Sequence, residues 1–101
     1  MKVFVVVRND LSRSQQAIQA GHAAMEIVVW GGLAKQEYEG CTLVYLKVQN
    51  EQELDKLLDQ VNESDGIAYP FHEPDLNDSM TAFATHATEQ VEKILENIPL
   101  L

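Results

Sequence analysis

Val3-Phe4-Val5-Val6-Val7 is the part of this 101-residue chain that most constrains its fold. All of its side chains are apolar and either β-branched or aromatic, and no polar residue interrupts them. A strand with one face in water alternates polar and apolar residues, so this run predicts a strand that is covered on both faces. The run stops at Arg8 and is too short to be the apolar core of a signal peptide.

A helix should follow this strand. Ser12 or Ser14 can cap its first turn, and Gly31-Gly32 supplies the glycine at which it should end. Between these ends, apolar residues recur close to the helical period, at Ala17, Ala20, Ala24, Ile27 and Val28. The small side chains among them suit a helix that lies close against a sheet.

Three further segments are expected to complete the sheet. Residues 41–48 should form the second strand, after a polar and irregular stretch over residues 33–40. A third strand begins at Ile67, and Pro70 should confine it to an edge of the sheet or interrupt it. Residues 80–85 should form the fourth strand.

Two amphipathic helices fill the remaining segments. Asn50 and Glu53 resemble a capping box, and apolar residues follow at helical spacing, at Leu54, Leu57, Leu58 and Val61. The last helix is marked by Val91, Ile94, Leu95 and Ile98. The order of elements is therefore βαβαββα, which predicts a single α/β domain over residues 1–101. Its four-stranded sheet should be mixed, because too few residues join the last two strands for a parallel crossover.

The net charge of −9 is distributed unevenly along the chain. Residues 1–50 hold five Lys and Arg against four Asp and Glu, a net charge of +1. Residues 51–101 hold two Lys and Arg against twelve Asp and Glu, a net charge of −10. A uniformly acidic surface would repel nucleic acid, so an anionic partner would have to bind through the first half.

Cysteine and histidine usage narrows the class of protein. The single Cys41 excludes an internal disulfide and a cysteine-rich zinc site, and it fits a reducing cytoplasm. The three histidines lack the spacing of known metal ligands, and the chain has neither a glycine-rich phosphate loop nor a nucleophile elbow. No stretch approaches the length of a membrane span. We expect a cytoplasmic protein.

A polar stripe on the first helix is the first candidate site. Gln15, Gln19, His22 and Glu26 follow each other at helical spacing, which places them on one side of the helix, opposite the alanines. Glu26 lies one turn after His22, so that its carboxylate could orient the imidazole. The alternative is an ordinary polar face in contact with water.

Two polar loops are the other candidates. The segment His72–Ser79 includes Glu73, Asp75 and Asn77 between two strands, where function often lies; the alternative is a turn whose residues were chosen for the backbone. Arg8-Asn9-Asp10 follows the first strand at its carboxyl end, the usual ligand-binding edge of an open α/β sheet. The alternative for that segment is a simple helix-entry loop.

Residues 2–11 together with Gln19-Ala20-Gly21-His22-Ala23-Ala24 resemble the opening of the type-2 peptidyl-tRNA hydrolases. Members of that family begin with an apolar strand that ends in Val-Arg-x-Asp-Leu, followed by a helix that carries Gln-x-x-His-Ala-Ala. The strand at 42–48 and the segment 80–84 also fall where the family has them. The resemblance therefore spans nearly the whole chain.

The resemblance implies a small α/β hydrolase with a four-stranded mixed sheet and helices on both faces. Such an enzyme cleaves the ester between a peptide and the terminal ribose of tRNA, uses no metal or organic cofactor, and commonly forms dimers. This chain departs from the family at Ser12-Arg13-Ser14-Gln15, which replaces a turn that carries a catalytic lysine; Gln15 stands near the position of that lysine. The family's Asp-Ala-Gly-x-Thr segment is also replaced, and its Asp matches Glu73 or Asp75.

Ester hydrolysis needs an activated water, stabilisation of an oxyanion and a proton for the leaving oxygen. We expect His22, Asp75 and Glu73 to supply the catalytic groups. The expected substrate-binding residues are Arg8, Asp10, Arg13, Gln15, Gln19, Asn77 and Thr81. Among them, Gln19 and Asn77 would position the ester, and Arg13 would bind the phosphate near the terminal ribose.

The uneven net charge of the chain predicts that peptidyl-tRNA binds with weak to moderate affinity, and that this affinity falls as salt is added. The alternative is a binding module that keeps the fold without catalysis and contacts a protein or an RNA end. A homodimer built on an apolar surface near Trp30 and Leu33 is compatible with either function.

Overall fold

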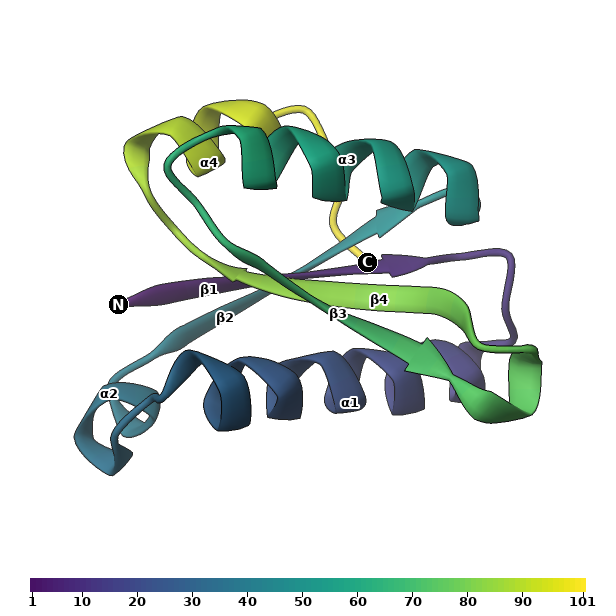
Figure 1. Ribbon diagram of the computed structural model, residues 1–101, viewed down its shortest axis with the longest axis horizontal. Coiled ribbons are helices and arrows are strands. Elements are labelled where there is room, and N and C mark those ends of the chain that lie inside the picture. Colours follow the sequence, from purple (N-terminus) through teal and green to yellow (C-terminus); the bar gives the residue numbers. More distant parts are fainter.

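The computed structural model describes residues 1–101 and arranges four strands in one sheet, in the order β2-β1-β4-β3 (Figure 1). The strands are β1 (Lys2–Arg8), β2 (Thr42–Val48), β3 (Ala68–Glu73) and β4 (Ser79–His86). β1 pairs parallel with β2 and antiparallel with β4, and β3 pairs antiparallel with β4. The sheet is mixed, as the sequence predicts.

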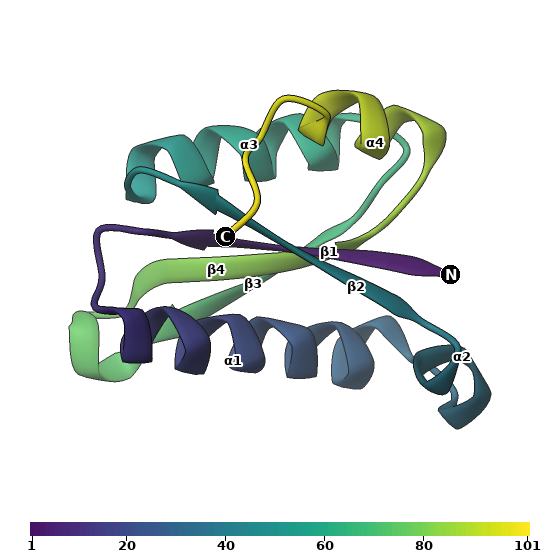
Figure 2. The ribbon, with the colours of Figure 1, turned by 180° about the vertical axis from the view of Figure 1, so that it is seen from behind.

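Helices cover both faces of this sheet (Figures 1 and 2). The long helix α1 (Arg13–Gly31) lies on one face, and α3 (Glu51–Glu63) lies on the other together with α4 (Glu89–Leu95). All side chains from Val3 to Val7 are buried between these layers, which confirms the strand covered on both sides. Large side chains fill the space between the sheet and helices α3 and α4, whereas the space between the sheet and α1 is packed mainly with valine and alanine.

The helix ends follow the local chemistry of the sequence. Ser12 caps α1, because its Oγ accepts a 3.2 Å hydrogen bond from the Gln15 N–H. Gly32 ends that helix in the left-handed conformation, with φ of +67°. Asn50 caps α3 by accepting a hydrogen bond from the Glu53 N–H, while the Glu53 carboxylate accepts one from the backbone N–H of Gln49.

Two expectations about the elements were wrong, and one loop contains a turn that was not predicted. A short helix, α2 (Lys35–Glu39), lies in the segment expected to be irregular; its first turn is held by the Glu37 carboxylate, which accepts from the Ala34 N–H, not by an apolar stripe. The last helix ends at Leu95 instead of Ile98. A 3₁₀ turn, η1 (Pro74–Leu76), lies within the loop after β3.

The residues beyond α4 run beside β2. The Lys47 N–H donates to the Pro99 carbonyl at 3.0 Å, and the Leu101 N–H donates to the Tyr45 carbonyl at 3.0 Å. This tail covers part of the free edge of β2, which otherwise would present unpaired backbone groups. At the opposite edge, Pro70 lies in β3, where a residue without an N–H is tolerated, as predicted.

The buried side of α1 differs from the expected one. Ala20, Ala23 and Ile27 are buried as part of the core, whereas Ala17 and Val28 are exposed. The reason is that α1 packs on β4, β3 and β1, so the side of the helix that faces β2 is left uncovered. No helix is long and apolar enough to cross a membrane.

Candidate active site

A fully buried amide, the side chain of Gln19, connects α1 to the last two strands. Its Oε1 accepts a 2.7 Å hydrogen bond from Thr81 Oγ1, and its Nε2 donates to Glu73 Oε1 at 3.0 Å and to Gln15 Oε1 at 3.1 Å. Burying an amide is costly unless it is hydrogen-bonded, and here both ends of the amide have partners. The interpretation of Gln19 as part of a polar face in water is therefore wrong, because this residue points into the protein.

The chemistry of the partners determines how the Gln19 amide is turned. An ionised carboxylate only accepts hydrogen bonds, so the NH₂ group of Gln19 must face Glu73 and its oxygen must face the Thr81 hydroxyl. The other oxygen of Glu73, Oε2, has no hydrogen-bond partner, and the residue is half-buried. The network thus holds a carboxylate with one oxygen free at the surface.

A β-bulge directs Thr81 toward this network. Phe71 of β3 pairs with Ala82, and the next residue, His72, pairs with Met80, so Thr81 has no cross-strand partner. Bulges turn side chains out of the regular alternation and are common beside functional sites. As a result, Thr81 and Ala82 both face α1, although they are consecutive in a strand.

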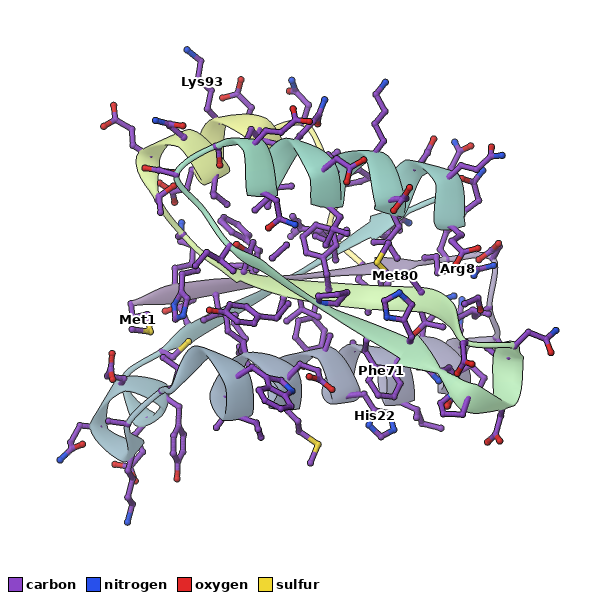
Figure 3. All side chains as sticks on the ribbon, viewed as in Figure 1. Met1, Arg8, His22, Phe71, Met80 and Lys93 are labelled. Carbon is purple, nitrogen blue, oxygen red and sulfur yellow. The ribbon has the colours of Figure 1, made fainter.

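His22 lies one helical turn after Gln19 and stacks on Phe71 (Figure 3). The two ring centroids are 4.3 Å apart and the ring planes differ by 7°. Phe71 is two residues before Glu73 in β3, so it lies on the same face of that strand. His22 forms no hydrogen bond, and none joins it to Glu26, so stacking alone holds the imidazole beside the network.

Arg8 and Asp10 pair with each other on the other side of the sheet. Arg8 Nε and Nη2 bind the two carboxylate oxygens of Asp10 at 2.7 and 2.9 Å, and Arg8 Nη1 donates to the Met80 carbonyl at 3.4 Å (Figure 3). The side-chain hydrogen bond with Arg8 lowers the pKa of Asp10 and raises the pKa of Arg8. Met80 is also held through its N–H, which donates to Glu51 at the start of α3. Arg8 and Asp10 thus brace the end of β1 and do not contact the Gln19 network.

The loop residues are spread over the surface near this end of the sheet. Asp75 is exposed in η1 and forms no side-chain hydrogen bond. Asn77 has a left-handed backbone with φ of +56°, a conformation that favours asparagine, which supports the turn interpretation for this residue. Arg13 is exposed in the first turn of α1 and its guanidinium forms no salt bridge.

Two residues that contribute to the site were not predicted from the sequence. Phe71 supports His22, and Gln16 holds the loop between β1 and α1, because its amide donates to the carbonyls of Leu11 and Asn9 at 2.7 and 3.3 Å. Alternation along β3 could have linked Phe71 to Glu73, but no local signal indicated the role of Gln16. The structure contains no group of His, Cys, Asp or Glu arranged to hold a metal ion.

Comparison with known proteins identifies the family to which the chain belongs. A solved structure described as a protein of unknown function from Agrobacterium tumefaciens strain C58 has a TM-score of 0.73 at 16% identity, covering 99% of this chain and 96% of that chain. At that identity the likeness shows the fold alone. A comparison with curated sequences gives no match. The family model described as peptidyl-tRNA hydrolase PTH2 matches residues 1–101, and with the sheet and helices in place over the same residues, the chain belongs to this family.

Proposed function

We propose that this protein hydrolyses the ester between the peptide and the terminal ribose of peptidyl-tRNA, at the surface formed by Gln15, His22 and Glu73. Membership of the family supports the substrate. The observation that carries the proposal is the hydrogen bond from the buried Gln19 amide to Glu73, which positions a carboxylate and leaves one of its oxygens free.

In this mechanism Glu73 is the general base. Its free Oε2 accepts a proton from a water molecule, and the oxygen of that water attacks the ester carbonyl carbon. Gln19 holds the carboxylate in place, and Thr81 holds Gln19. Positioning of this kind lowers the barrier because the base is already oriented when the ester arrives.

Gln15 is the proposed donor to the oxyanion. Its Oε1 accepts from Gln19, so its Nε2 is turned away from the network, and that NH₂ group has no hydrogen-bond partner. A free donor beside the base can stabilise the negative charge that develops on the carbonyl oxygen. Gln15 stands near the position where the family carries its lysine, and it supplies a neutral donor in place of a charged one.

His22 completes the proposed chemistry. When the tetrahedral intermediate collapses, the bond between the carbonyl carbon and the ribose oxygen breaks, and that oxygen needs a proton. The imidazole lies beside the network on the same helix and can supply it. Arg13 and the exposed loop residues Asp75 and Asn77 are proposed to contact the tRNA end around this centre.

We further propose that the protein is a cytoplasmic homodimer. Three apolar side chains near the end of α1 are largely exposed, with exposed fractions of 64% for Met25, 68% for Val29 and 74% for Trp30. Contiguous exposed apolar side chains on a small domain mark an interaction surface. Because a two-fold dimer uses the same surface of both subunits, this end of α1 is the candidate interface.

Cleavage of peptidyl-tRNA by three matched proteins tests the hydrolase. Glu73→Gln keeps an acceptor for Gln19 but cannot take a proton, so we expect kcat/KM to fall by about 10²- to 10⁴-fold. Glu63→Gln makes the same change at an exposed position of α3 where the carboxylate forms no salt bridge, and should leave kcat/KM unchanged. Full activity of Glu73→Gln would overturn the assignment of the base. No cleavage by the folded wild type would instead favour the non-catalytic binding module.

A further inference from the structure

A pocket of about 560 Å³ lies between the start of α1 and β2. It is lined by Asn9, Arg13, Gln16, Tyr45, Lys47 and Leu101. None of these residues belongs to the Gln19 network, which lies on the other side of α1 toward β3 and β4.

The pocket exists because α1 does not cover β2. Side chains alternate along that strand, so Leu46 and Val48 face α3 and α4, whereas Tyr45 and Lys47 face the α1 layer. Because α1 packs on β4, β3 and β1, Tyr45 and Lys47 are only partly buried. Hydrogen bonds from the tail to β2 close the outer side, through the Leu101 N–H and the Tyr45 carbonyl.

The pocket is basic in an acidic protein. Arg13 and Lys47 both line it, neither forms a salt bridge, and no Asp or Glu side chain lines it. By contrast, the hollow between α4 and β1 contains three glutamates beside its two lysines. The first turn of α1 also lacks an acidic residue, so the partial positive charge at the start of this helix is not neutralised. The pocket is therefore suited to an anion.

The remaining lining groups are suited to a nucleobase. The Tyr45 ring offers an aromatic surface on which a base can stack. The side-chain amide of Asn9 forms no hydrogen bond, so its donor and its acceptor are both free. Gln16 uses its NH₂ group to hold the loop, which leaves its Oε1 as an acceptor. Stacking combined with amide contacts is how proteins bind the bases of single-stranded RNA.

We infer that this pocket binds one nucleotide of the single-stranded acceptor end of tRNA, with its phosphate on Arg13 and Lys47 and its base on Tyr45. The inference rests on the proposed function, because it assigns the other end of the same substrate. Arg13, Gln16 and Ala17 lie on the side of α1 that faces the pocket, while Gln15 and Gln19 lie on the side that faces Glu73. An RNA end that crosses the first turn of α1 would reach both places.

Binding of a short RNA that ends in CCA and carries no ester tests the inference. Affinity is measured by fluorescence anisotropy over a range of salt concentrations. For Arg13→Ala and for Lys47→Ala, we expect weaker binding and a slope of log K against log salt reduced by about 0.7, as for one lost phosphate contact on a single strand. Lys56→Ala is the matched control, because it removes the same charge from an exposed position on α3 without a partner.

Tyr45→Leu tests the contact with the nucleobase separately from the contacts with the phosphate. It keeps an apolar side chain at a partly buried position, so the fold should survive, which circular dichroism checks. We expect binding to weaken by about tenfold with the salt slope unchanged. Equal effects of Lys47→Ala and Lys56→Ala, or no effect of Tyr45→Leu in a folded protein, would overturn the pocket, as would failure of the wild type to bind this RNA at low salt.

The RNA carries no ester, so its binding is independent of hydrolysis. Loss of cleavage in Glu73→Gln together with Lys47-independent RNA binding would overturn the pocket and leave the proposed function standing. RNA binding that depends on Lys47 and Tyr45, in a protein that cleaves no peptidyl-tRNA, would support the pocket and overturn the hydrolase.

Discussion

The Thr81 hydroxyl donates a 2.7 Å hydrogen bond to Gln19 Oε1, across 62 residues of sequence and with both side chains fully buried. The Glu73 carboxylate can only accept, so it fixes the NH₂ end of the Gln19 amide, and the Thr81 hydroxyl provides the donor that the buried oxygen at the other end needs. The contact should therefore contribute to stability as well as to the position of the base.

Removal of either partner should destabilise the protein. Gln19→Leu leaves the Thr81 hydroxyl buried without a partner, and Thr81→Val leaves the Gln19 oxygen in the same state. We expect each variant to lower the free energy of unfolding by about 1–3 kcal/mol in urea titrations. The double variant should lose less free energy of unfolding than the sum of the two single variants, because neither the Thr81 hydroxyl nor the Gln19 oxygen is then left buried without a partner. Strict additivity would show that the hydrogen bond contributes nothing.

Replacement of His22 should separate its stacking from its chemistry. His22→Phe keeps a flat ring on Phe71 but has no proton to donate. We expect thermal unfolding close to that of the wild type and a kcat on peptidyl-tRNA lower by about 10²-fold or more. His22→Ala, which also loses the stack, serves as the comparison. Unchanged kcat in His22→Phe would limit this residue to a packing role.

Two changes at Gln15 should have different effects on kcat. Gln15→Met removes the free NH₂ group, and we expect kcat to fall by about 10²- to 10³-fold, as for other oxyanion donors. Gln15→Lys restores a donor with a positive charge and should retain activity at or above the wild-type level. Measurement of kcat and KM for both variants checks this, and equal losses in the two would exclude Gln15 as the donor.

Stability at low pH should depend on Asp10. Its pKa is lowered in the folded protein, chiefly by the hydrogen bond with Arg8, so the unfolded chain takes up the proton first as the pH falls. The stabilisation is present above the unfolded pKa of about 3.9 and is lost as the pH falls through the folded pKa. Asp10→Asn should therefore show a smaller loss of stability between neutral and acidic pH. Added salt should reduce the difference, because the pair is partly exposed. An identical acid profile in both proteins would contradict this.

The exposed end of α1 should control the oligomeric state. Trp30→Glu places a charge in the proposed interface at a position that is 74% exposed, so the fold of the subunit should not change. Sedimentation equilibrium should give a dimer for the wild type and a monomer for the variant. A monomeric wild type would contradict the proposed interface.

Local signals predicted most of the elements correctly. The uninterrupted apolar run in β1 and the caps at Ser12 and Asn50 depend only on neighbouring residues, so the sequence alone reveals them. The two failures have different causes. α2 has no apolar stripe and is held by a local contact between the Glu37 carboxylate and the Ala34 N–H. α4 ends early because the tail leaves it to join β2, which is a contact between distant segments.

The sequence alone predicts that a mixed sheet lies between helices, because a run of apolar strand residues cannot be left in water and short connections cannot make parallel crossovers. It also presented Gln19, His22 and Glu73 as polar candidates. The burial of Gln19 and the position of Arg8 outside its network are seen only in the folded protein. The rotation of α1 on the sheet and the bulge that turns Thr81 inward arise from packing between distant segments, which periodicity along the chain does not encode.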